Sequence, residues 1–185
     1  MKRYVWKVFF DHEKEEVWLN GMSAKGLAFT DFFLFRYSFL DCEPGEYIYR
    51  IELLETLPDH PEGMKYICFM AENRVEHVSS WFRWVYFRKR ASDGQFDIYS
   101  DIDSRLNYYR RVNKLLFPIM WFELFVGVRG VLYFIDYMNG ESGATLLFNI
   151  ISGALMIYIG VAIFGAWHSL RKKILILKKE KLLRE

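Results

Sequence analysis

Apolar residues gather in two long stretches near the C-terminal end of the chain, whereas the residues before them mix apolar and polar positions. The stretches at 115–135 and 144–168 are each long enough to cross a bilayer. A hydrocarbon core about 30 Å thick needs roughly 20 apolar residues in a helix that rises about 1.5 Å per residue. We therefore expect two transmembrane helices, joined by a short connector at 136–143.

The residues before the first apolar stretch have the pattern of a folded α+β domain. Residues 3–10 are aromatic and β-branched, which predicts a strand. Asp11 is a suitable N-cap for a following helix, and Gly26 is a suitable left-handed C-terminal residue. The Pro44-Gly45 pair predicts a tight turn between two further strands.

The predicted elements occur in the order βαββαβ. After the first helix we expect strands at 28–40 and 46–54, a helix at 64–78 and a strand at 81–90. This order is typical of a ferredoxin-like domain, in which two helices cover one face of four antiparallel strands. The sequence therefore predicts a ferredoxin-like α+β domain followed by a helical stalk and a transmembrane hairpin.

These predictions divide the chain into consecutive parts. They are a cytoplasmic α+β domain at 1–98, a helical stalk at 99–114, transmembrane helices at 115–135 and 144–168, an external loop at 136–143, and a basic amphipathic tail at 169–185. The tail combines cations with leucine and isoleucine, so we expect it to lie on an anionic membrane surface, gaining about 1 kcal/mol per nearby cation. A cytosolic partner is the alternative occupant of the tail.

The cations close to the two apolar stretches determine the expected orientation. The net charge of the whole chain is only +2, but the connector at 136–143 contains no Lys or Arg. The cations that we expect at the membrane surface are Arg110, Arg111, Lys114, Arg171, Lys172, Lys173, Lys178 and Lys179. Because cytoplasmic flanks are enriched in Lys and Arg, both chain ends are predicted to be cytoplasmic in a protein with two spans.

Three polar residues inside the apolar stretches are the strongest candidates for function. Glu123 and Arg129 lie in the first stretch and Asn149 lies in the second. An ionisable group at this depth is costly unless it is paired, protonated or hydrated. Six residues on one helix separate the two charges by about 240°, which excludes a good ion pair within the helix. Structural and functional roles both remain open.

The second apolar stretch also contains many small residues, which allow helices to approach closely. They are Gly153, Gly160, Ala162, Gly165 and Ala166. This pattern predicts either packing of the hairpin against itself or association of several copies into a homo-oligomer.

The domain shows no catalytic, cofactor or metal-binding motif. The acidic residues Glu13, Glu15 and Glu16 suit the first turns of a solvated helix, with a cation site or a docking patch for a partner as the alternative. Cys42 and Cys68 lack metal-ligand spacing, and we interpret them as ordinary thiols. Nucleic acid is not expected as a partner, because the aromatic segment at 81–90 lacks the glycine-containing RNP pattern.

Three segments resemble the bacterial family called domain of unknown function 2812. They are FFDHEKEEVWLNGMSAKG at 9–26, PGEYIYRIELL at 44–54 and WVYFRKRASDGQFDIYSDIDSR at 84–105. The resemblance implies a bacterial cell membrane location, C-terminal spans and a gene neighbour that encodes a PadR-type transcriptional regulator. It supplies no catalytic residues.

Two functions from different classes are compatible with these observations. The first is a sensory or regulatory module that binds a partner or a ligand through its cytoplasmic domain. The second is a small transport or envelope-defence component whose spans form oligomers. An enzyme whose site leaves no motif is a third class, and the sequence identifies neither the ligand nor the physiological process.

Overall fold

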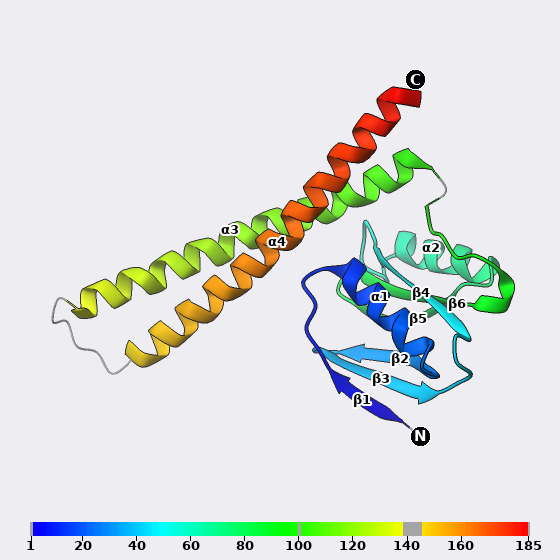
Figure 1. Ribbon diagram of the computed structural model, residues 1–185, viewed down its shortest axis with the longest axis horizontal. Helices are drawn as coiled ribbons and strands as arrows, with labels where there is room; N and C mark the ends of the chain where they lie inside the picture. The colour runs from blue at the N-terminus through cyan, green and yellow to red at the C-terminus, as the bar shows by residue number, and fades with distance from the viewer. Residues whose placement is uncertain (1, 100, 139–145, 185) are drawn as a thin grey trace. The chain divides into compact units, whose positions relative to one another are not determined.

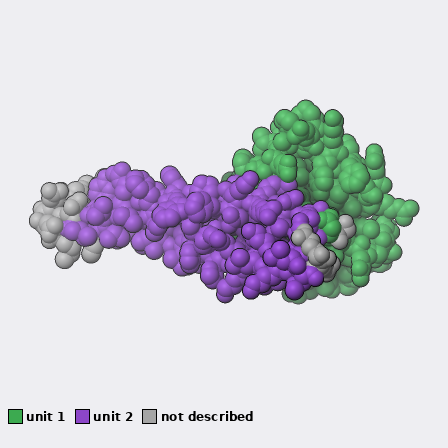
Figure 2. Space-filling view, turned by 90° about the horizontal axis from the view of Figure 1, so that it is seen from above, with its two compact units in different colours: residues 1–101 green, residues 102–185 purple. Residues whose placement is uncertain are grey.

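The computed structural model describes residues 2–99, 101–138 and 146–184 (Figure 1). They form two compact units, residues 1–101 and residues 102–185, which are coloured green and purple in Figure 2. The elements of the first unit are β1 (Arg3–Trp6), α1 (His12–Ser23), β2 (Leu27–Phe33), β3 (Arg36–Asp41), β4 (Tyr47–Leu53), α2 (Pro61–Glu72), β5 (Glu76–Trp81), β6 (Trp84–Arg90) and the short 3₁₀ helix η1 (Ala91–Asp93). The second unit contains α3 (Ile102–Met138) and α4 (Leu146–Arg184).

The strands of the first unit form two antiparallel sheets of three strands each among the described residues. Their orders are β1-β3-β2 and β4-β6-β5. The two sheets meet where β2 passes β5, and there the backbone N–H of Phe32 donates to Oγ of Ser79 at 3.1 Å. A cluster of eight buried residues draws on both sheets and on α1. Its members are Leu19, Phe29, Phe32, Tyr37, Phe39, Tyr49, Ile51 and Tyr86.

This arrangement differs from the expected ferredoxin-like sheet of four strands, whose topology is not confirmed. The segment 28–40 was expected to be one strand, but Leu34 and Phe35 adopt φ of 43° and 66° and reverse the chain between β2 and β3. The helix expected over 64–78 ends at Glu72, and Arg74 with φ of 61° leads into β5. Neither reversal contains the Gly or Pro that normally indicates one.

Helix α1 covers the free edge of β4 with three polar side chains. The Asn20 amide accepts from the backbone N–H of Tyr49 at 2.8 Å and donates to its carbonyl at 3.0 Å. Oγ of Ser23 makes the same pair of hydrogen bonds with the backbone of Tyr47, and a carboxylate oxygen of Glu16 accepts from the N–H of Ile51. One face of the helix therefore satisfies alternate residues of the strand edge. Asp11 caps the helix by accepting from Glu13 N–H at 3.0 Å, as predicted.

The second unit is an antiparallel pair of long helices (Figure 1). Helix α3 contains residues 102–114 of the predicted stalk and the whole predicted first span, and α4 contains the predicted second span from residue 146 and the predicted tail up to residue 184. Most of the predicted external loop, residues 139–143, lies outside the described residues. Both helices contain windows long and apolar enough to cross a membrane, with mean hydropathy of 1.7 and 2.0. Few residues of either window are buried in the structure, so the apolar side chains point outward.

Candidate functional site

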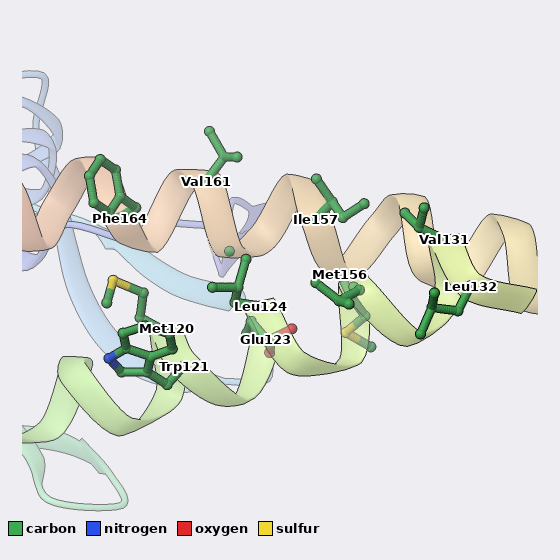
Figure 3. A pocket seen from close by; sticks show the side chains of 13 residues that line it. Met120, Trp121, Glu123, Leu124, Val131, Leu132, Met156, Ile157, Val161 and Phe164 are labelled. Carbon is green, nitrogen blue, oxygen red and sulfur yellow. The ribbon is translucent and has the colours of Figure 1, made fainter.

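A groove runs between the two long helices and has a volume of about 600 Å³ (Figure 3). The residues that line it are Met120, Trp121, Glu123, Leu124, Gly127, Val128, Val131 and Leu132 from α3, with Met156, Ile157, Gly160, Val161 and Phe164 from α4. Glu123 is the ionisable member of this lining. The groove is therefore an apolar surface that carries one carboxylate.

The carboxylate of Glu123 is partly buried and lacks a complete set of partners. Its Oε2 atom is inaccessible to solvent and has no hydrogen-bond partner among the residues that the structure describes. Figure 3 shows Glu123 in the groove among Leu124, Met156 and Ile157. The helix opposite is close at this point, because a Cβ atom built on Gly160 would lie 3.4 Å from Cβ of Glu123. Beside the groove there is thus a carboxylate oxygen for which the described residues supply no donor.

The structure places the other two intramembrane candidates away from Glu123. Arg129 is exposed, donates to the hydroxyl of Tyr133 at 3.0 Å and lies over the ring of the same residue. Asn149 lies beside Gly130, seven residues along α3 from Glu123, which is about 10 Å of helix. The candidates expected from the sequence therefore form no single cluster, and Glu123 alone belongs to the groove.

Glycines allow the two helices to approach closely. A Cβ atom built on Gly130 would lie 2.7 Å from Cα of Gly153, and one built on Gly127 would lie 2.8 Å from Cγ1 of Ile157. Gly130 and Gly153 therefore lie at a close approach of the helices, whereas Gly160 is in ordinary contact with Glu123 and no described atom lies within 4 Å of a Cβ atom at Gly165.

The basic residues expected at the membrane surface lie at one end of the helix pair, because the start of α3 and the end of α4 are adjacent (Figure 1). Lys181 near the end of α4 donates to Asp103 near the start of α3 at 2.7 Å. Arg110 donates to Asn107, whereas Arg111, Arg171 and Lys173 lie over the rings of Tyr108, Trp167 and Tyr109. The exposed members of the set are Arg110, Lys114, Arg171, Lys172, Lys178 and Lys179.

In the first unit, Glu15 lies in the core rather than on the solvated face expected from the sequence. It is 8% exposed, and its Oε1 atom accepts hydrogen bonds from the hydroxyls of Tyr37 and Tyr86, both at 2.7 Å. Burial raises the pKa of this carboxyl, and the two hydrogen bonds oppose that rise. Burial and the adjacent Glu15 also raise the pKa of both tyrosines. The group is a closed polar cluster inside the apolar core.

Glu16 also makes contacts within the first unit rather than facing solvent alone. It pairs with Arg50 at 3.3 Å and accepts from the N–H of Ile51. Burial raises the pKa of the Glu16 carboxyl, and the positive charge of Arg50 acts in the opposite direction. The acidic start of α1 therefore serves internal contacts and offers no free acidic patch at these two positions.

The tips of two hairpins form an exposed apolar surface that the sequence patterns do not predict. We call it the tip surface; it consists of Trp6, Phe33, Leu34, Phe35, Trp81 and Phe82. The rings of Phe33 and Trp81 are 6.1 Å apart, which joins the β2–β3 tip to the β5–β6 tip. Trp6 pairs with Arg36 in the β1–β3 ladder, so it lies at the same end. Trp6 is 70% exposed and Phe82 is 60% exposed.

Backbone conformation makes the tip surface unusual. Leu34, Phe35 and Phe82 all have positive φ, a region that is unfavourable for large L-residues and is normally left to Gly or Asn. Exposed side chains gain little from burial that could offset this strain. Strained residues of this kind concentrate at functional surfaces. The sequence signal is a run of aromatic residues at a chain reversal, as in FFLF at 32–35 and WFRW at 81–84.

The fold and these sites define an α+β protein that carries two long apolar helices. The model of the family described as "Protein of unknown function (DUF2812)" matches residues 11–121, and the chain belongs to this family. The matched region covers most of the α+β unit and the first part of α3. No curated protein and no solved structure matches the chain.

Proposed function

We propose that the protein is a membrane-anchored regulatory module, whose α+β unit binds a protein partner through the tip surface. The helix pair spans the bilayer in this proposal, with both chain ends in the cytoplasm. Two features support that placement. The apolar windows face outward, and the cations of α3 and α4 gather at one end of the pair.

The observation that carries the proposal is the tip surface itself. Six large apolar residues are exposed at one end of the sheets, three of them in a backbone conformation that they disfavour. Contiguous exposed apolar surface of this kind marks interaction sites. Trp and Phe are enriched at the centre of protein interfaces, where a few large side chains provide most of the binding energy.

Charge around the tip surface indicates the chemistry of the partner. The flanking segments 5–8, 32–37 and 80–84 contain Lys7, Arg36 and Arg83 and no carboxylate. A partner face with an apolar centre and an acidic rim fits this surface, because opposite charges steer association and exclude wrong partners. A PadR-type regulator, which the family resemblance suggests, is the first partner to test.

The test uses the full-length chain in detergent and a purified PadR-type regulator. Phe82→Ser and Trp81→Ser are expected to weaken binding at least tenfold, since each removes a large side chain from the centre of the surface. Val17→Ser is the matched control, because Val17 is exposed on α1 and does not belong to the tip surface. Binding that is absent, or equally strong in all variants, contradicts this partner.

A photo-reactive residue placed at position 82, 35 or 17, one position at a time, gives a second readout that does not depend on the choice of partner. In native membranes, the same protein adduct is expected from position 82 and position 35, and none from position 17. The adduct must then bind the purified chain and lose that binding in the Phe82→Ser variant. Adducts formed equally from position 17 argue against a specific tip surface.

A second function, as a small transport or envelope-defence component, is favoured by the buried Glu123 oxygen. Glu123→Gln and Arg129→Leu are expected to abolish export or toxin resistance if the helices form a pathway through oligomers. Unchanged resistance in both variants, together with a strict requirement for the α+β unit, rules out this second function.

A further inference from the structure

We propose that the groove beside Glu123 binds a lipophilic cation, that is, an apolar molecule carrying one positive charge. This site goes beyond the regulatory function proposed above and does not depend on the tip surface. It rests on three features of the second unit: the Glu123 carboxylate, the glycines around it and the apolar walls of the groove.

The carboxylate determines the charge of the ligand. Oε2 of Glu123 is buried and unpartnered among the described residues, and Glu123 is the ionisable residue of the groove lining. A charge in such surroundings is strongly unfavourable unless an opposite charge or a proton accompanies it. Arg129 does not supply that charge, because it is engaged with Tyr133 outside the groove lining. The partner that we infer is a cation from outside the helix pair, which takes the place of a proton on the carboxylate.

The walls determine the rest of the ligand. The groove volume of about 600 Å³ lies within the range of sites for small organic molecules. Trp121 and Phe164 offer aromatic faces, which attract cations, and Met120 and Met156 offer flexible apolar contacts. A hydrophilic cation would gain from the aromatic faces alone and would leave the rest of the apolar walls uncovered. A cation with an apolar body would gain from both the walls and the carboxylate.

Glycines keep the space next to the carboxylate open. A side chain at Gly160 would start 3.4 Å from Cβ of Glu123 and would fill the groove at this point. Gly165 lies one turn beyond Gly160 on α4, is exposed and does not line the groove. The same substitution at the two positions therefore distinguishes the effect of filling the groove from the effect of replacing a glycine of α4.

A second copy of the chain is a poorer occupant than a cation. If two copies associate in parallel about an axis along the membrane normal, equivalent residues lie at the same depth. Glu123 would then face Glu123, while Arg129 would lie about 9 Å away along the helix axis. The carboxylate would gain a like charge at its own level instead of a partner.

The test measures binding of two ions of similar size and opposite charge, tetraphenylphosphonium and tetraphenylborate, to the full-length chain in lipid nanodiscs. Equilibrium dialysis with empty nanodiscs subtracts partitioning into lipid. Saturable binding of about one tetraphenylphosphonium per chain is expected, with no saturable binding of tetraphenylborate. Glu123→Gln is expected to weaken binding at least tenfold, and Gly160→Leu to abolish it. Gly165→Leu should leave it unchanged.

Circular dichroism of each variant verifies that the helices remain folded. If Glu123→Gln fails to fold, the comparison of Gly160→Leu with Gly165→Leu still tests the site, because only Gly160→Leu is expected to lose phosphonium binding. Equal binding of both ions, or unchanged binding in Glu123→Gln and Gly160→Leu, overturns the site. So does a dimer that blocks phosphonium binding and dissociates in Gly160→Leu, since a second copy then occupies the groove.

Discussion

Each unit contains a glutamate with a carboxylate oxygen shielded from solvent, and the two glutamates differ in their hydrogen bonding. In the α+β unit, Glu15 receives hydrogen bonds from two tyrosine hydroxyls inside an apolar core. In the helix pair, Oε2 of Glu123 is inaccessible to solvent and has no hydrogen-bond partner among the described residues. A carboxylate that accepts hydrogen bonds within the core is part of the fold, whereas one with an unpartnered buried oxygen is a candidate binding site.

The difference follows from the elements available around each carboxylate. Sheets bring tyrosines from distant strands to one point, and Tyr86 lies 71 residues from Glu15 in sequence. In a pair of helices, each residue faces only a few side chains of the other helix. The residue that faces Glu123 is Gly160, which has no side chain to donate a hydrogen bond. We therefore expect substitutions of Glu15 to act on stability and substitutions of Glu123 to act on binding.

The largest effect is expected from Glu15→Leu. This change leaves the hydroxyls of Tyr37 and Tyr86 buried without their acceptor, and each unsatisfied group costs about 1–3 kcal/mol, so a loss of about 2–6 kcal/mol is expected. Thermal unfolding of the full-length chain in detergent, followed by tryptophan fluorescence, measures it. Lys14→Leu on the exposed face is the control. Adding Tyr37→Phe and Tyr86→Phe should recover part of the loss; no recovery would contradict the assignment of the cost to orphaned hydroxyls.

A smaller effect is expected from Gly130→Leu in the helix pair. The new side chain would start 2.7 Å from Cα of Gly153, so the helices must move apart, at a cost of about 1–3 kcal/mol. The thermal midpoint of the helical circular dichroism signal in detergent measures this change. Gly165→Leu places the same side chain in open space and should have little effect. Equal midpoints for the two variants would show that the close approach does not matter.

The pH dependence of stability should distinguish the ionised and neutral forms of Glu15. Because burial raises its pKa in the folded state, the folded chain binds this proton more tightly than the unfolded chain. Its contribution to stability is therefore greatest below the ordinary pKa of 4.5 and declines as pH rises through the raised value. Glu15→Gln should flatten this part of the curve. An unaltered slope between acidic and neutral pH would mean that another group is responsible.

The smallest effect is expected at Phe82, where stability and binding should change in opposite directions. Glycine tolerates the observed φ of 55°, so Phe82→Gly is expected to stabilise the fold by up to about 1 kcal/mol while partner binding is lost. Gly45→Ala is the counterpart, because Gly45 has φ of 76° in open space and should lose about 1 kcal/mol. Urea unfolding measures both. A clear loss of stability in Phe82→Gly would show that the ring supports the fold.

Local sequence signals predicted the features that depend on neighbouring residues. The two apolar stretches, the Asp11 cap and the turn at Gly45 all follow from composition within a few residues. The reversals at Leu34-Phe35 and Phe82 were missed because they use none of the usual turn residues. The burial of Glu15 could not be predicted, since its partners come from β3 and β6.

The candidate site was predictable to a similar extent. The sequence shows Glu123 as an ionisable residue in an apolar stretch. It does not show that Gly160 of α4 lies opposite this residue. The separation of Asn149 from Glu123 required the register of the two helices, which small residues on both of them determine.

The three polar side chains that α1 lays along β4 also limit how this domain can add strands. Glu16, Asn20 and Ser23 form hydrogen bonds with backbone groups of β4. A peptide that added a strand to this edge would need the same groups. The edges of β2 and β5 face each other across the Phe32–Ser79 hydrogen bond. Among the described strands, β1 therefore keeps a free edge, and the charges of Arg3 in this strand and of Lys7 just after it oppose uncontrolled edge pairing between copies.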